Sequence, residues 1–244
     1  MEYKYTSIIL GKKDVGETDR IYFLYTLENG KVQALAKGVR RAQAKLAGSL
    51  ENFTYADITV VRNQGMGKVT SSVIENSFPS IRRDYDSLSK VFNAVNIFNK
   101  VVDFGNEDKE VFILLKQYLE TMDSQSLIAA TMNPVEYEEK LELLTAIFLW
   151  KLLNVLGYGS ELNSCADCGS PVDKDDIYFS AQSGGIICKK CFEANRNKLM
   201  LSLNAVKLMR IAVGNEMKFF ARIKVQRKDV NFLKMAIKEI LAWI

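Results

Sequence analysis

The first third of the chain alternates hydrophobic and polar residues with the two-residue period of β-strands. Five short strands are predicted, over residues 3–10, 20–27, 32–36, 53–62 and 69–75. Asn29-Gly30, between the second and third strands, predicts a type I′ hairpin turn, because both central residues of that turn have positive φ angles. A short helical or looped stretch is expected at 42–48. This order predicts a five-stranded Greek-key barrel of the oligonucleotide-binding (OB) type, and an SH3-like barrel is the alternative.

From about residue 84 the hydrophobic spacing changes to the 3.6-residue period of α-helices. Five amphipathic helices are expected, with apolar stripes at 88–102, 111–122, 137–155, 206–213 and 230–241. We interpret these stripes as core. Ser202 and Asp229 are expected to cap the N-termini of the last two helices, because their side chains accept hydrogen bonds from free backbone N–H groups.

All four cysteines fall in one window, as two C-x2-C pairs separated by nineteen residues: Cys165, Cys168, Cys188 and Cys191. Two residues between ligands let both sulfurs of a pair face one point, and two pairs complete a tetrahedron. The spacing predicts one structural Zn²⁺ per chain, because four thiolates leave no open coordination position. Disulfides, a redox pair and an iron–sulfur cluster fit less well. A hairpin at 177–187 would bring the pairs together, and Lys189, Lys190 and Arg196 could let this region contact DNA.

These patterns predict an α+β multidomain protein with a C-terminal helical domain that contains an embedded four-cysteine zinc finger. The expected domains are the OB-fold barrel at 1–80, the first part of the helical domain at 81–160, the zinc-finger insert at 161–198 and the last part of the helical domain at 199–244.

Several classes of function are disfavoured by what the sequence lacks. It has no histidine, which excludes mechanisms that use imidazole as a base or a ligand. Gly65-Met66-Gly67-Lys68 lacks the Ser or Thr of a phosphate-binding P-loop, and paired acids such as Glu138-Glu139 do not face each other on a helix. We therefore expect no enzymatic activity. No apolar run is long enough for a membrane span and no signal peptide is evident, so a cytoplasmic protein is expected.

Charge is distributed unevenly along the chain. The net charge is +4 overall, but it is +4 over residues 1–85, −7 over 86–197 and +7 over 198–244. Basic ends favour contact with a polyanion, although a solvated basic surface would give the same composition. Residues 37–45 carry four cations and no acid: Lys37, Arg40, Arg41 and Lys45. Tyr22, Phe23 and Tyr25 on the second strand either pack in the barrel or stack on bases.

Three stretches together resemble the RecO family of bacterial recombinational repair proteins. They are Gly16-Glu17-Thr18-Asp19-Arg20, then Lys37-Gly38-Val39-Arg40-Arg41 with the following Leu46-Ala47-Gly48-Ser49-Leu50-Glu51-Asn52-Phe53, and the cysteine quartet. Asn52 stands where the family usually has proline, in a turn. The resemblance covers the whole chain and implies an OB barrel and a helical domain with an inserted zinc finger.

The resemblance also implies a function. Family members bind single- and double-stranded DNA, anneal complementary strands and, with RecR, assist the loading of RecA onto DNA coated with single-strand binding protein (SSB). It implies a nucleoid-associated protein whose barrel binds DNA through Lys37, Arg40 and Arg41, with Arg20, Lys45, Arg62 and Lys68 as further candidates. The helical domain would receive the acidic, hydrophobic tail of SSB, and a basic segment is the candidate site: Lys218, Arg222, Lys224, Arg227 and Lys228.

Three other functions stay open on the sequence. The same barrel and zinc ribbon would suit an RNA-binding translation or ribosome-associated factor. An enzyme acting through carboxylates and a metal would need a convergent acidic cluster. A scaffold that only bridges proteins would not bind nucleic acid at low salt.

Overall fold

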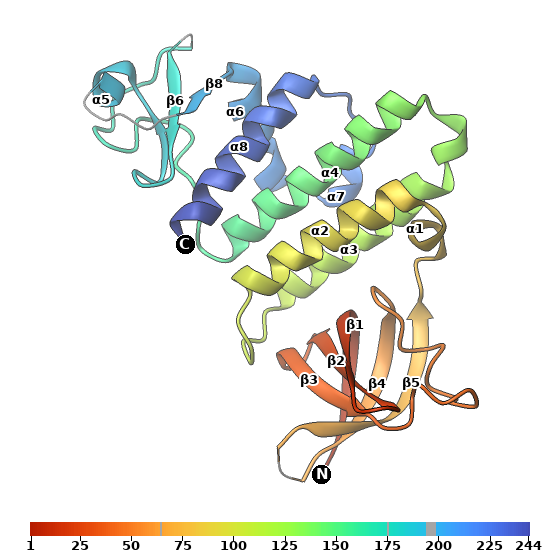
Figure 1. Cartoon of the computed structure of the whole chain (residues 1–244). Helices are drawn as coiled ribbons and strands as arrows, with labels where there is room; N and C mark the ends of the chain where they lie inside the picture. The colour runs from red at the N-terminus through yellow and green to blue at the C-terminus, as the bar shows by residue number, and fades with distance from the viewer. Residues whose placement is uncertain (64, 175, 194–198) are drawn as a thin grey trace. The chain divides into compact units, whose positions relative to one another are not determined.

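The protein is described by a computed structural model that covers residues 1–63, 65–174, 176–193 and 199–244 (Figure 1). Its residues group into two compact units, Met1–Leu127 and Ile128–Ile244. The first unit contains a β-barrel and three helices, and the second contains the remaining helices and the cysteine region. The domain boundary expected at residue 80 lies inside the first unit.

Five strands in the first unit close into a barrel. They are β1 (Glu2–Val15), β2 (Asp19–Thr26), β3 (Gly30–Ala36), β4 (Tyr55–Val61) and β5 (Gly67–Asn76). The strand order is β1-β2-β3-β5-β4, and β1 closes the ring against β4. The β3–β5 pair is parallel and the other pairs are antiparallel. This arrangement confirms the predicted OB-type barrel.

The first strand is longer than its hydrophobic pattern predicts. It continues beyond Leu10 to Val15, and it pairs with β4 through Glu2–Ile8 and with β2 through Ser7–Val15. A register shift between Ile9 and Gly11 accompanies the change of partner. One bent strand therefore belongs to both sides of the barrel, as barrel closure requires. The barrel core includes Ile9, Tyr22, Leu24, Ile58 and Val60.

The β2–β3 turn differs from the predicted type I′ turn. Gly30 has φ of +58°, but Asn29 is not among the residues with positive φ. Three residues separate the paired Thr26 and Gly30, and the Thr26 hydroxyl donates to the Gly30 carbonyl at 3.0 Å. The loop therefore has three residues, Leu27–Asn29, and the left-handed glycine is the first residue of β3. Residues 42–48 form successive turns, so the looped interpretation of this stretch holds.

Three helices complete the first unit: α1 (Pro79–Arg83), α2 (Tyr85–Val101) and α3 (Lys109–Leu127). The pattern predicts α2 and α3 but not the short α1. Asp84 caps α2 by accepting from the Ser87 N–H at 3.3 Å. Tyr25 of β2 is fully buried, with ring centroids 5.0 Å from Phe98 of α2 and 6.3 Å from Phe112 of α3. The barrel and the helix pair therefore share a core.

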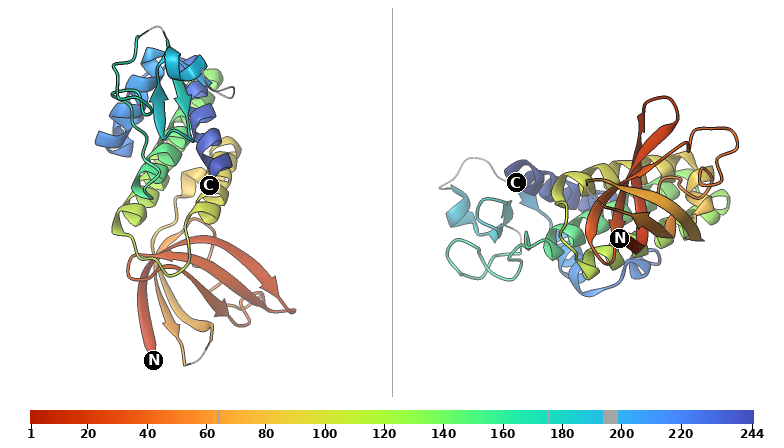
Figure 2. Two further views of the ribbon diagram at one scale, coloured as in Figure 1. Left: turned by 90° about the vertical axis from the view of Figure 1, so that its left-hand side faces the viewer. Right: turned by 90° about the horizontal axis from the view of Figure 1, so that it is seen from below.

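The second unit is built on the long helix α4 (Pro134–Val155), which buries eleven residues. A 3₁₀ turn (Ala129–Thr131) precedes it, and α6 (Leu203–Gly214), α7 (Met217–Phe220) and α8 (Arg227–Trp243) pack against it. A sheet of β6 (Ile177–Ser180), β7 (Gly185–Ile187) and β8 (Leu199–Leu201), with the short α5 (Lys189–Glu193), forms the cysteine region (Figure 2). The predicted hairpin at 177–187 is confirmed, and β8 is an addition.

The two predicted helix caps have different outcomes. Ser202 caps α6 as expected, accepting from the Ala205 N–H at 3.0 Å. Asp229 as the cap of α8 is wrong, because α8 begins at Arg227 after Gln226. The Asp229 carboxylate is instead buried and accepts a 2.5 Å hydrogen bond from the Ser202 hydroxyl. A residue type that favours caps is used here to join the starts of two helices.

Three lysines place their ammonium groups at the C-terminal ends of helices, where backbone carbonyls lack partners. Lys31 donates to the carbonyls of Asn99 and Val102, Lys140 to those of Phe220 and Ile223, and Lys151 to those of Ala212, Val213 and Asn215. Burial lowers the pKa of all three ammonium groups.

Candidate nucleic-acid interface and metal centre

The basic stretch of the barrel lies in the turns that follow β3. Lys37, Arg40, Arg41 and Lys45 are all exposed there. Val39, Leu46 and Leu50 from the same connection pack into the barrel core. The apolar residues thus anchor the turns, and the four cations between them face solvent.

Asp19 holds these turns against the β1–β2 loop. Its carboxylate accepts from the Gly38 N–H at 2.7 Å and from the Thr18 hydroxyl at 3.0 Å. The Gly38 N–H, and secondarily the Thr18 hydroxyl, lowers the pKa of the Asp19 carboxyl. The Arg40 N–H donates to the Thr18 carbonyl at 3.0 Å. The two sequence motifs Gly16–Arg20 and Lys37–Arg41 are therefore one structural unit, and Asp19 is a residue whose role the sequence reasoning missed.

Arg20 and Arg40 share an acidic partner, Asp14 near the end of β1. The Arg20 Nε lies 2.7 Å from Asp14 Oδ1, and the Arg40 Nη1 lies 3.5 Å from Asp14 Oδ2. The hydrogen bond from Arg20 lowers the pKa of the Asp14 carboxyl and raises the pKa of Arg20. No sequence pattern indicates Asp14, because its partners come together only through strand pairing.

The last two candidates, Arg62 just after β4 and Lys68 near the start of β5, are both exposed. Lys68 pairs with Leu35, two residues before Lys37, so the register places it beside the strand that leads into the basic turns. The Arg62 carbonyl accepts a 2.9 Å hydrogen bond from the N-terminal ammonium group. No hydrogen bond or ion pair among the described residues joins the Arg62 side chain to the other candidates.

The aromatic residues of β2 do not form a stacking platform. Tyr22 is fully buried in the barrel core. Tyr25 is buried against α2 and α3, so its interpretation as a base-stacking residue is wrong. Its large ring joins the two parts of the first unit instead. Only Phe23 is partly accessible.

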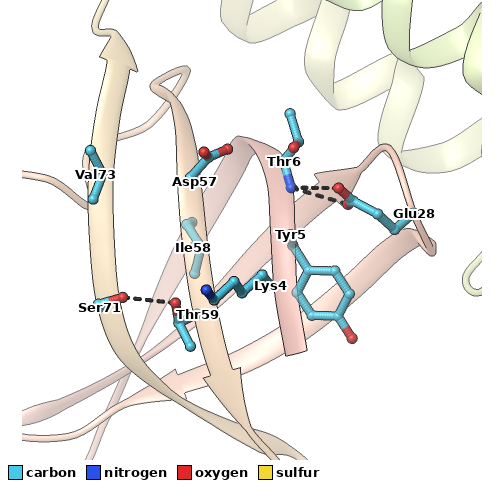
Figure 3. Close-up of a pocket in the computed structure, with 9 residues that line it drawn as sticks. All are labelled: Lys4, Tyr5, Thr6, Glu28, Asp57, Ile58, Thr59, Ser71 and Val73. Carbon is cyan, nitrogen blue, oxygen red and sulfur yellow. Dashed lines mark hydrogen bonds between the residues drawn. The ribbon is translucent and has the colours of Figure 1, made fainter. Parts of the chain in front are cut away.

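A pocket of ≈ 350 Å³ lies on another part of the barrel, on β1, β4 and β5 (Figure 3). Lys4, Glu28 and Asp57 are among its lining residues, so charges of both signs surround it. Glu28 accepts from the Thr6 N–H with both carboxylate oxygens at 3.0 Å. None of the predicted site residues lines this pocket.

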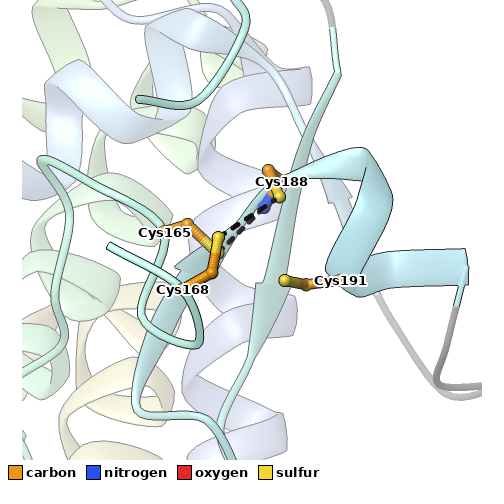
Figure 4. Close-up of side chains that lie close together, drawn as sticks. All are labelled: Cys165, Cys168, Cys188 and Cys191. Atoms are coloured by element: carbon orange, nitrogen blue, oxygen red, sulfur yellow. Dashed lines mark hydrogen bonds between the residues drawn. The ribbon is translucent and has the colours of Figure 1, made fainter. Parts of the chain in front are cut away.

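The four cysteines come together at the edge of the small sheet (Figure 4). Their sulfur atoms all lie within 4.8 Å of one another, and the sulfurs of Cys168 and Cys188 are 3.9 Å apart. Sulfurs bound at about 2.3 Å around a tetrahedral zinc ion would be about 3.8 Å apart. The donor set and its spacing therefore fit a four-coordinate metal ion.

Local backbone geometry shapes both pairs. The Gly169 N–H donates to the Cys165 carbonyl at 2.8 Å, and Gly169 has φ of +73°, which closes a tight turn around the first pair. The second pair spans the start of α5, where the Phe192 N–H donates to the Cys188 carbonyl at 2.9 Å. The Cys188 N–H also points at the Cys165 sulfur, at 3.4 Å.

The thiols perturb one another strongly. Hydrogen bonds from Ser170 lower the pKa of Cys168 to about 6, whereas the hydrogen bond with Cys168 raises the pKa of Cys191 to about 12. Four neighbouring thiols cannot all ionise without a cation among them, because like charges this close repel. Nearby, Lys189 pairs with Asp176 at 3.5 Å, and Arg196 lies outside the described residues.

The five cations of the basic segment in the second unit are all exposed: Lys218, Arg222, Lys224, Arg227 and Lys228. Two of these cations have acidic neighbours: Lys218 lies 2.7 Å from Glu216 and Lys224 lies 3.0 Å from Glu136. Phe219, 40% exposed, lies between the first two cations in sequence. The segment therefore presents positive charge together with one accessible aromatic ring.

No helix in the described part of the chain has the length and apolar character needed to cross a bilayer.

Comparison with known proteins identifies the family. Residues 1–78 match the family "Recombination protein O N terminal", and residues 82–243 match "Recombination protein O C terminal". The chain is 31% identical over 243 residues to the DNA repair protein RecO of Dehalococcoides mccartyi, covering 100% of this chain and 90% of that protein. It is 30% identical over 218 residues to the RecO protein of Acetivibrio thermocellus, covering 89% of this chain and 82% of that protein. The chain therefore belongs to the RecO family of DNA repair proteins.

Proposed function

We propose that this protein acts in recombinational repair by binding single- and double-stranded DNA and annealing complementary strands. It would assist the loading of RecA onto SSB-coated DNA together with RecR. The action is physical rather than catalytic. Cations on the barrel screen the repulsion between two phosphate backbones, and base pairing then supplies the driving force.

The observation that carries this proposal is the set of four exposed cations, Lys37, Arg40, Arg41 and Lys45, on turns anchored in the barrel core. Because the backbone of these turns is anchored, the turns lose little conformational freedom on binding, and more of the electrostatic attraction contributes to affinity. Family membership favours DNA repair over the alternative of an RNA-binding translation or ribosome factor.

We propose that the metal held by the cysteine quartet is Zn²⁺ and that it is structural. Cys165, Cys168, Cys188 and Cys191 would all be ligands, which leaves no position for a reacting water molecule. A bound zinc ion would hold the first turn to the start of α5 and so stabilise the turns at the edge of the small sheet.

We propose the exposed segment at Lys218, Arg222, Lys224, Arg227 and Lys228 as the site for the SSB tail. An acidic, hydrophobic peptide would pair with these cations and place an apolar side chain against Phe219. The ion pairs of Lys218 and Lys224 would exchange their acidic partners for those of the peptide.

Annealing of fluorescently labelled complementary oligonucleotides, bare and SSB-coated, tests the proposed activity. The protein should accelerate annealing of both, and RecR should be needed for RecA filament formation on the coated strand. Competition between single-stranded DNA and structured RNA separates the two functions. Failure to accelerate annealing, or a clear preference for RNA, would contradict the proposal.

A further inference from the structure

One carboxylate joins two of the proposed DNA-binding arginines. Asp14 contacts the guanidinium groups of Arg20 and Arg40, with a different oxygen to each, at 2.7 and 3.5 Å. The side chain of Asp14 is 49% exposed, and those of Arg20 and Arg40 are 24% and 36% exposed. Among the described residues, the Asp14 side chain forms hydrogen bonds and ion pairs only with these two arginines.

We propose that Arg20 and Arg40 form a phosphate-binding site, that Asp14 occupies it in the free protein, and that a backbone phosphate of DNA displaces Asp14 on binding. This inference rests on the proposed DNA-binding function. Asp14 would act as an internal competitor that limits affinity for any phosphate backbone.

The chemistry of the ligands supports the exchange. Guanidinium groups bind carboxylates and phosphates through the same pattern of parallel N–H donors. Two arginines that each contact one oxygen of Asp14 could each contact one oxygen of a single phosphate. A phosphodiester carries one negative charge, as the carboxylate does, so the exchange leaves the charge of the site unchanged.

The backbone of both arginines is held by contacts that do not involve the Asp14 side chain. Arg20 is paired with Ala36 in the β2–β3 ladder, and the Arg40 N–H is bonded to the Thr18 carbonyl. Asp14 is half-exposed, so its carboxylate can turn into water. Breaking an ion pair at this level of exposure costs little, because water solvates the separated charges.

Two nearby acids therefore have different roles. Asp19 accepts from a backbone N–H and maintains the shape of the basic turns. Asp14 contacts side chains only, and a phosphate can take its place at both guanidinium groups. Removing the Asp14 charge should therefore strengthen DNA binding. If the carboxylate instead positioned the arginines for DNA, removing it would weaken binding.

The test compares Asp14→Asn with Asp57→Asn in binding to a single-stranded oligonucleotide at low salt. Asp57 is an exposed acid on β4, paired with Thr6 of β1, so its substitution makes the same change in net charge. We expect Asp14→Asn to lower the Kd roughly two- to fivefold, because the exposed ion pairs that DNA must break are weak. Asp57→Asn should change the Kd by less than that. In the Arg40→Ala background the gain from Asp14→Asn should shrink.

An unchanged or weaker affinity of Asp14→Asn would overturn the proposed displacement. An equal gain from Asp57→Asn would also overturn it, because the effect would then be one of net charge. Matching thermal unfolding curves exclude misfolding as the cause, and Asp14→Ser provides a second variant without the carboxylate. If the wild-type protein bound no DNA, the proposed function itself would fail. The wild-type measurement therefore distinguishes failure of the proposed function from failure of the proposed displacement of Asp14.

Discussion

At the scale of single residues, two glycines with the same backbone conformation have different surroundings. Gly16 and Gly30 both have φ of +58°. A Cβ on Gly16 would meet nothing within 4 Å, but a Cβ on Gly30 would lie 2.0 Å from the Asn106 carbonyl oxygen. Gly30 is needed both for its left-handed conformation and for the close approach of the α2–α3 loop.

Substitution by alanine should therefore lower the free energy of unfolding by different amounts at Gly16 and Gly30. Gly16→Ala should lower the free energy of unfolding by about 1–2 kcal/mol, because alanine is strained in the left-handed conformation. Gly30→Ala should lose roughly a further 1–3 kcal/mol, since a backbone clash has to be relieved. Urea denaturation of the two variants measures the difference. Equal losses would show that the loop does not lie against Gly30.

Asp19 gives a pH-dependent prediction. The Gly38 N–H lowers the pKa of its carboxyl in the folded protein below the value in the unfolded chain. Its contribution to stability is therefore complete above the ordinary aspartate pKa and is lost as the pH falls through the lowered, folded value.

The stability difference between wild type and Asp19→Asn should therefore be constant above about pH 5 and shrink below about pH 4. Chemical denaturation at several pH values measures it, and the Gly38 amide resonance reports the same titration. A difference that stayed constant down to about pH 2 would contradict the proposed hydrogen bond.

At the scale of elements, the sequence predicts most of the secondary structure because periodicity reflects burial directly. The alternation of 53–62 corresponds to a strand with one buried face, and the stripe of 137–155 corresponds to a helix that buries the stripe and, over Ala146–Trp150, its other faces as well. Short elements such as α1 and α7 escape prediction because one helical turn is too short to show a period. Residues used for tertiary contacts, such as Asp229, are misread because local preference does not reveal a distant partner.

The same limit applies to the candidate site. The metal ligands follow from spacing, since C-x2-C constrains both sulfurs locally. Exposure of the basic turns follows from their composition. Asp14 and Asp19 could not be found, because strand pairing alone brings them to Arg40 and Gly38.

The shared core of barrel and helices predicts how the chain can be divided. A fragment of residues 1–127 should fold cooperatively, whereas a fragment of 1–80 should be unstable or molten. The shorter fragment would expose Tyr25 and leave the Lys31 ammonium without the carbonyls of Asn99 and Val102. A large buried aromatic alone contributes about 2–3 kcal/mol. Circular dichroism and thermal melts distinguish the fragments, and a cooperative melt of 1–80 would refute the prediction.

At the scale of the whole molecule, metal removal should act on one region only. A strong chelator should release about one zinc ion per chain and increase amide exchange in residues 161–193, because the metal is expected to stabilise this small sheet. Amides of the barrel strands in the same sample serve as the internal control. Release of no metal, or equal deprotection of the barrel, would count against a local structural zinc.

In the proposed function, the barrel's cations bind DNA by neutralising its phosphates. The most direct measurement is the affinity for single-stranded DNA across a salt series, for wild type and for Arg40→Ala/Arg41→Ala. Lys100→Ala/Lys207→Ala, which removes two exposed cations elsewhere, is the matched control. If both arginines contact phosphates, the slope of log K against log salt should become shallower by about 1.4 in the arginine variant and change little in the control. An unchanged slope in the arginine variant would contradict the account.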